Sequence, residues 1–217
     1  MIKERVVNIM SQIVKVEIHE FSHNVKNLGL LTNAKTIGAV GYSKGEETEV
    51  EKYALVITTA DGVRGEYVTH WGGNSAACAQ TKMLAPKLLE YRAEQRELIF
   101  DDFKRELRQF DHMGHGPLDI ALWDWAGKKL NCSISLLLGS YRNKLPAYAS
   151  TYHGDRNGGL DSKEAFSSFA EECYDLGYRA FKIHGWHEGN AKEEAENLLH
   201  VAKNVGDKIT LMIDPAC

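Results

Sequence analysis

The 217-residue sequence has few cysteines and no long apolar run. Its four cysteines lie far apart and form no CxxC pair, which excludes a zinc ribbon or a dithiol redox motif. We expect reduced thiols in a cytoplasmic protein, packed as small buried hydrophobes. No stretch approaches the roughly 20 apolar residues of a bilayer-spanning helix. The charged N-terminus, MIKERVVNIM, does not resemble a signal peptide, so no membrane partner is expected.

The sequence also lacks an excess of positive charge. It contains 26 Lys and Arg against 30 Asp and Glu, a net charge of −4. This balance gives no reason to expect nucleic acid or an acidic membrane surface as a partner. The apolar content of 43% is ordinary for a soluble globular protein, and the length suits one large domain or two modest ones.

The first third of the chain has the alternating pattern of antiparallel strands. Apolar residues recur at every second position from Val14 to Ile18, and residues 53–59 form a second strand. Asp61-Gly62 then predicts a hairpin turn into a return strand. The polar, glycine-rich segment from Ser22 to Glu51 predicts a long loop, a kind of segment that is usually functional or mobile.

The rest of the chain changes character twice. Residues 75–139 have helical spacing, with helices expected over 76–89, 98–110 and from Gly116. From Pro146 onward, strands recur about every thirty residues with one helix between them, a pattern typical of parallel βαβ units. The expected strands are 147–151, 180–184 and 209–214, and the expected helices are 162–176 and 191–205.

Three chemically active residues fall at the ends of the predicted parallel strands. Lys182 and His184 end the second strand, and Asp214 ends the third. Active sites of parallel βα proteins lie at the carboxyl ends of the strands. Each residue also has a structural interpretation: a snorkelling lysine, a hydrogen-bonded core histidine or a turn-capping aspartate. Together they indicate a site with a cation, an imidazole and a carboxylate that could bind a hard cation such as Mg²⁺.

Two further histidines, His112 and His115, lie three residues apart in the stretch FDHMGHGP. Their spacing resembles a metal-ligand pair. The adjoining glycines and Pro117 instead indicate a loop before a helix, so we do not expect a metal site there.

Several motifs resemble those of one family. DIALWDWAGKKLNCSISLLLGSYRNKLPAYAS (residues 119–150) is similar to the join between its capping domain and its barrel, and TADGVRGE (59–66) to its capping-domain hairpin. AFKIHGW (180–186) is similar to its second-strand Lys-x-Lys motif, and LMIDPAC (211–217) to its third-strand aspartate motif. The family is the mandelate racemase and muconate lactonizing group of the enolase superfamily. The resemblance implies an α+β capping domain over residues 1–145, followed over 146–217 by the start of a (β/α) TIM-type barrel with about three strands.

The resemblance also implies a reaction. Such enzymes remove the proton α to a carboxylate and form an enediolate, with a Lys or His base and Mg²⁺. By position, Asp214 would be the first metal ligand, and Lys182 would stabilise charge beside the substrate carboxylate. His184 stands where many members carry a second lysine, so it could be a base, a general acid or only a hydrogen-bonding group. We therefore expect an acid-sugar dehydratase, with a racemase or epimerase of a hydroxy or amino acid as the alternative.

Further residues are candidates for substrate contact. In this family the long first loop of the capping domain closes over the barrel mouth, which suggests His19, His23, Lys35 and Tyr42. His153 and Asp155 follow the first barrel strand. Each of the four loop residues could also be solvated or support the fold. The expected partner is a small carboxylate, either a hydroxy acid or an acid sugar, and the resemblance implies a homo-oligomer.

The predicted barrel is incomplete, because three strands do not close a barrel that typically needs about 250 residues. We expect the sequence to be the N-terminal part of a longer enzyme. The remaining metal ligands and an opposing base would lie beyond Cys217, so this chain alone should be inactive. An inactive scaffold or a subunit contact is the non-enzymatic alternative.

Overall fold

A computed structural model describes residues 11–30, 40–70, 74–151, 153–154, 159–186 and 189–215. The chain forms two compact units. Unit 1 comprises Met1–His23 with Val50–Asn143, and unit 2 comprises Asn24–Glu49 with Lys144–Cys217. Within the described ranges, no helix is both long enough and apolar enough to cross a bilayer. The division into domains 1–145 and 146–217 stays a prediction.

The antiparallel sheet has the strand order β1-β2-β3. Its strands are β1 (Ile13–Leu30), β2 (Val40–Thr59) and β3 (Arg64–Val68). The Asp61-Gly62 turn joins β2 to β3, and the Asp61 carboxylate accepts hydrogen bonds from the Thr59 hydroxyl at 2.6 Å and the Val63 N–H at 3.2 Å. Gly62 has φ of +82°, the positive φ that such turns require.

The prediction of a loop from Ser22 to Glu51 is wrong for residues 22–30 and 40–51, which the structure describes as strands. Strand β1 continues to Leu30 and β2 starts at Val40. In this extension the Thr48 hydroxyl donates to the Leu28 carbonyl at 2.6 Å, and Gly45 N–H donates to the Asn27 side chain at 3.0 Å. These hydrogen bonds between two polar segments stabilise pairing that alternating hydrophobicity does not reveal.

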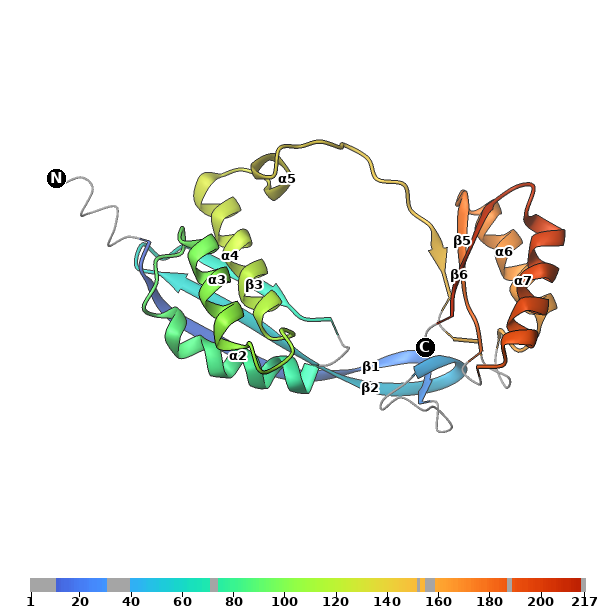
Figure 1. The fold of residues 1–217 in the computed structure, drawn as a ribbon, viewed down its shortest axis with the longest axis horizontal. Coiled ribbons are helices and arrows are strands. Elements are labelled where there is room, and N and C mark those ends of the chain that lie inside the picture. The colour runs from blue at the N-terminus through green and yellow to red at the C-terminus, as the bar shows by residue number, and fades with distance from the viewer. Residues whose placement is uncertain are drawn as a thin grey trace. The chain divides into compact units, whose positions relative to one another are not determined.

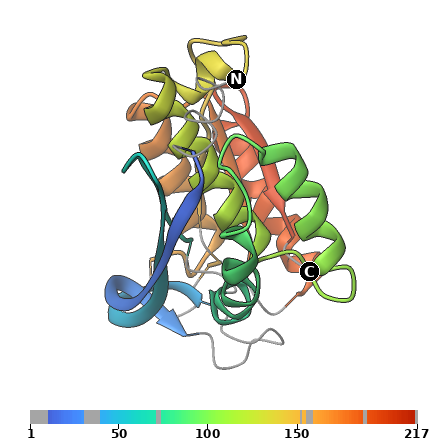
Figure 2. The same cartoon turned by 90° about the vertical axis from the view of Figure 1, so that its left-hand side faces the viewer.

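Helices pack against this sheet and bury its apolar face. Figure 1 shows them gathered beside the strands of unit 1, and Figure 2 shows the same group after a 90° turn. They are α2 (Asn74–Leu88), α3 (Arg96–Glu106), α4 (His115–Leu130) and the short α5 (Ile134–Leu137). The core of unit 1 joins Leu55 and Ile57 of β2 to Phe103 of α3 and Leu122 of α4, all fully buried. The helices predicted from sequence exist, with ends that differ by a few residues.

Unit 2 contains the predicted βαβαβ pattern. Its sheet has the order β4-β5-β6, and both strand pairs are parallel. Its elements are β4 (Ala149–Ser150), α6 (Lys163–Asp175), β5 (Ala180–His184), α7 (Ala191–Val205) and β6 (Thr210–Asp214). The apolar stripes of α6 and α7 cover Phe181 and Ile183 of β5, both fully buried. This sheet is the partial parallel sheet that the sequence predicts.

Local signals explain where the helices of unit 2 begin and end. The Ser162 hydroxyl accepts a hydrogen bond from Ala165 N–H at 3.2 Å, which caps the start of α6. The Asn190 side chain accepts from Glu193 N–H and caps α7 in the same way. Gly177 follows α6 with φ of +102°, the left-handed conformation that commonly ends a helix.

Candidate functional site

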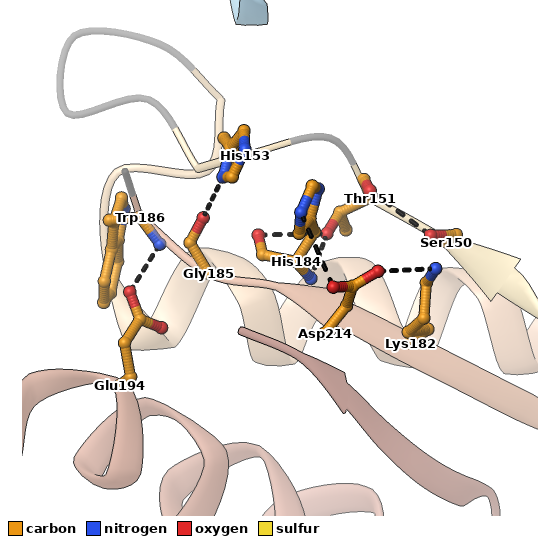
Figure 3. Close-up of polar contacts among 9 residues, drawn as sticks. All are labelled: Ser150, Thr151, His153, Lys182, His184, Gly185, Trp186, Glu194 and Asp214. Carbon is orange, nitrogen blue, oxygen red and sulfur yellow. Dashed lines mark hydrogen bonds and ion pairs between the residues drawn. The ribbon is translucent and has the colours of Figure 1, made fainter. Parts of the chain in front are cut away.

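The candidate site lies at the carboxyl end of β5, the central strand of the parallel sheet (Figure 3). Because side chains alternate along a strand, Phe181 and Ile183 enter the core, while Lys182 and His184 share the opposite face. The parallel register pairs His184 with Asp214 of β6. Local sequence and register thus bring two basic side chains and one carboxylate to one edge of the sheet.

The Asp214 carboxylate lies between the two basic residues. Its Oδ2 accepts a hydrogen bond from Lys182 Nζ at 3.1 Å. Its Oδ1 lies 3.9 Å from His184 Nε2, an ion-pair distance for a protonated ring but too long for a hydrogen bond. The three side chains are partly exposed, at 24%, 22% and 40% for Lys182, His184 and Asp214, so a small molecule can reach them.

The environment of Lys182 keeps it positively charged. The hydrogen bond to Asp214 raises the pKa of Lys182 above its ordinary value, and attraction to Tyr148 acts in the same direction. The ammonium group also lies 5.3 Å from the centroid of the Tyr148 ring, within the range of a cation–π contact. In this arrangement Lys182 is suited to stabilise an anion.

Two residues after β4 support His184. The Thr151 hydroxyl oxygen accepts a hydrogen bond from His184 N–H at 2.9 Å. The His153 ring stacks on the His184 ring with centroids 3.8 Å apart and an interplanar angle of 28°. The sequence pointed to His153 but missed Thr151 and Tyr148. The rule that strand ends carry functional groups could have found Thr151, because it directly follows β4.

A cavity of about 350 Å³ opens beside these residues. Asp214 and His153 line it together with Gly185, Glu194 of α7 and apolar side chains of α7 and β6. The Glu194 carboxylate accepts a hydrogen bond from Trp186 N–H at 2.5 Å, which fixes the chain after β5. The Asp214 carboxylate is thus accessible from this cavity.

The other candidates for substrate contact stay predictions. His19 and His23 are exposed side chains on the part of β1 that belongs to unit 1. Tyr42 lies in β2, but its side chain is outside the described residues, as are Lys35 and Asp155. His115, considered above as a metal ligand, is instead a buried residue in the first turn of α4.

The site could supply part of the ligand set of a magnesium ion. Mg²⁺ prefers oxygen ligands and is often held by one or two carboxylates together with water and substrate oxygens. Asp214 offers such a carboxylate, whereas Lys182 cannot be a ligand. Across the part of the chain that the structure describes, no three or more His, Cys, Asp or Glu side chains gather in a way that could hold a metal. Asp214 would therefore be one ligand among several.

Sequence comparison relates the chain to known enzymes. Residues 42–139 match the family model "Mandelate racemase / muconate lactonizing enzyme, N-terminal domain". A 3,6-anhydro-alpha-L-galactonate cycloisomerase of Streptomyces coelicolor is 28% identical over 181 residues, which cover 78% of this chain and 48% of the relative. An arabinonate dehydratase of Saccharolobus solfataricus is 26% identical over 178 residues, which cover 77% and 46%. The chain thus spans about half the length of the curated relatives it matches.

Solved structures give the same picture of the fold. D-glucarate dehydratase from Agrobacterium tumefaciens, complexed with magnesium, matches with a TM-score of 0.75 and 27% identity over 94% of this chain and 54% of that chain. A Streptomyces coelicolor racemase with bound magnesium matches with a TM-score of 0.73 at 24% identity, over 94% and 55%, and shows the fold alone. These matches establish the predicted fold class, a capping domain followed by the start of a βα barrel.

Proposed function

Because residues 42–139 match the N-terminal domain of the mandelate racemase and muconate lactonizing group, we propose that this chain is part of an enolase-superfamily enzyme that removes the proton α to a carboxylate. The expected overall reaction is the dehydration of an acid sugar. The observation that carries the proposal is the group of Lys182, His184 and Asp214 at the carboxyl ends of β5 and β6, with Asp214 hydrogen-bonded to Lys182 at 3.1 Å.

Asp214 is the residue of this site that would hold Mg²⁺. When bound, Mg²⁺ supplies a positive charge that neutralises the substrate carboxylate and lowers the cost of forming the enediolate. Asp214 is 40% exposed and faces the cavity, so its carboxylate is accessible. The magnesium-bound glucarate dehydratase among the structural matches supports this assignment.

Lys182 and His184 have different proposed roles. Lys182, kept charged by Asp214, binds the substrate carboxylate and stabilises the negative charge that develops on it. His184 moves the proton through Nε2, because a neutral imidazole nitrogen can accept a proton and an imidazolium can return it. Dehydration needs one proton acceptor for the α proton and one donor for the departing hydroxide, and a histidine can serve as either.

The matched relatives favour acid sugars as the substrate class. One is named a dehydratase of arabinonate, and another a cycloisomerase of an anhydro sugar acid. Both names describe aldonate-type carboxylates with hydroxyl or ether oxygens on neighbouring carbons. We therefore propose that the substrate is an aldonate or aldarate with a hydroxyl group on the carbon β to the carboxylate.

The test is a substrate screen with the full-length protein that contains this chain. Aldonates and aldarates are incubated with and without Mg²⁺, and formation of the 2-keto-3-deoxy acid is measured. We expect water elimination from at least one acid sugar that requires Mg²⁺ and is abolished in Asp214→Asn. Full turnover in a folded Asp214→Asn variant would contradict the metal assignment, and no elimination from any acid sugar would contradict the proposed reaction.

A further inference from the structure

The backbone at His153 and Gly154 pairs with two other segments of unit 2. The backbone of His153 bridges in parallel to Gly41, and that of the next residue, Gly154, bridges to Trp186. A Cβ added to Gly154 would lie 2.6 Å from the Trp186 ring, so this approach requires glycine. The segment that carries His153 therefore has a fixed position beside the chain that follows β5.

The ring of His153 is also fixed. Its Nδ1 lies 3.1 Å from the carbonyl oxygen of Gly185 (Figure 3). A carbonyl oxygen only accepts hydrogen bonds, so Nδ1 must carry the hydrogen. This hydrogen bond sets the rotation of the ring and defines its tautomer when the ring is neutral.

The fixed ring lies against His184. The two imidazoles stack with centroids 3.8 Å apart and an interplanar angle of 28°. Thr151 holds the backbone of His184 at 2.9 Å, but that contact leaves rotation about the side-chain bonds free. The stacked His153 ring limits this rotation and keeps Nε2 of His184 facing Asp214.

We propose that His153 is a positioning residue for His184: its ring, fixed by the Gly185 carbonyl, holds the His184 imidazole over the Asp214 carboxylate. The inference rests on the proposed function, because His184 is the proton-transfer group there. It differs from substrate binding, the role that the sequence suggested for His153. Proton transfer needs close alignment, and a displacement of about 1 Å can lower a rate on the order of 100-fold.

Two substitutions in the full-length protein separate these roles. His153→Ala removes both the stacking and the hydrogen bond, whereas His153→Phe keeps a ring against His184. We expect His153→Ala to lower kcat about 10- to 100-fold with little change in KM, and His153→Phe to recover most of kcat. A raised KM with unchanged kcat in both variants would show a substrate contact and overturn the inference.

The matched control is His200→Ala. His200 lies on α7, 3.9 Å from Glu164, and takes no part in the proposed site, so kcat and KM should stay at the wild-type values. The melting temperature of each variant is measured alongside, and kcat is referred to folded protein. A fall in kcat no larger than that of His200→Ala would overturn the inference.

A spectroscopic measurement tests the contact without turnover. Protons above the face of an aromatic ring are shielded, so the ring protons of His184 should shift downfield in His153→Ala and stay shielded in His153→Phe. Unchanged His184 resonances in His153→Ala would contradict the stacking. A wild-type protein without turnover on any acid sugar would instead contradict the proposed function, whatever the resonances show.

Discussion

At the scale of single residues, burial determines the chemistry of His115. This residue begins α4, is 5% exposed and lies 4.6 Å from the Phe100 ring and 6.3 Å from the Phe103 ring. Among the described residues its Nε2 has no hydrogen-bond partner. Burial lowers the pKa of His115, although nearby Asp119 acts in the opposite direction. Folding therefore favours the neutral ring.

This shift predicts a pH dependence of stability. Below the unfolded pKa of about 6.5 the unfolded chain binds a proton that folded His115 does not, so the free energy of unfolding falls as pH drops. The slope is at most about 1.4 kcal/mol per pH unit. In His115→Leu the slope of the free energy of unfolding against pH should flatten between about pH 5.5 and 7.5. The control His23→Gln, at an exposed position, should keep the wild-type slope. Urea unfolding at several pH values checks this, and identical slopes in wild type and His115→Leu would be inconsistent with a depressed pKa.

Strand alternation and the strand-end rule predicted that Lys182, His184 and Asp214 would lie together, and they do. The same rules could not predict the stacking of His153 on His184, because it depends on where His153 lies relative to the end of β5. They also could not predict that Tyr148 approaches Lys182. Tyr148 precedes β4, outside the region that the strand-end rule covers.

At the scale of elements, the contact between β3 and α4 has no spare room. A Cβ at Gly65 would overlap the carbonyl oxygen of Ala121 and lie 2.7 Å from the Cβ of Trp125. Polar contacts join the same elements, since Glu66 N–H donates to the Asp124 carboxylate at 2.8 Å and Lys128 pairs with Glu66 at 2.9 Å. The absence of a side chain at Gly65 thus allows β3 to pack closely on α4.

Gly65→Ala should therefore destabilise unit 1. Overpacking of this kind typically costs about 1–3 kcal/mol, seen as a lower urea midpoint at unchanged slope. The control is Gly116→Ala in the first turn of α4, where an added Cβ meets nothing within 4 Å. That change should be neutral or stabilise by up to about 1 kcal/mol. Equal stability of Gly65→Ala and wild type would show that the two elements can separate without cost.

Helix α7 offers a second comparison on its side toward α6. Asn197 is 1% exposed, and among the described residues neither polar atom of its side chain has a hydrogen-bond partner. Asn204, two turns later, donates to the Ser167 hydroxyl of α6 at 3.0 Å. Two asparagines on one helix therefore differ in whether their polar groups are satisfied.

The two should respond in opposite directions to leucine. Asn197→Leu removes two unpaired buried groups and should raise the free energy of unfolding by about 1–2 kcal/mol. Asn204→Leu breaks a hydrogen bond and should lower it by about 0.5–1.5 kcal/mol. Chemical denaturation of both variants measures the difference. A destabilised Asn197→Leu would mean that the amide makes hydrogen bonds in solution.

Element types were predictable wherever the hydrophobic pattern was strong, as in α6 and α7. Prediction failed over Ser22 to Glu51, where β1 and β2 extend. The extension is polar, and hydrogen bonds such as that from Thr48 to Leu28 stabilise it. Such pairing depends on which strand lies opposite, and local sequence does not contain that information.

At the scale of the whole molecule, the chain forms two compact units with different sheets. Unit 1 has its own core of sheet and helices, and unit 2 has the parallel order β4-β5-β6. The chain spans about half of its curated relatives. The reaction is therefore proposed for a protein that contains this chain, with Lys182, His184 and Asp214 as the proposed contribution of the chain.

The most direct test of this account is solvent-deuterium incorporation at the α carbon of an acid-sugar substrate, measured by NMR with the full-length protein and Mg²⁺ in D₂O. Wild type should exchange the α proton or place deuterium in the product. His184→Asn should lose this exchange because the imidazole that moves the proton is absent, and Lys182→Met should slow the exchange through loss of charge stabilisation. Exchange at the wild-type rate in both folded variants would contradict the claim that the end of β5 performs the proton transfer.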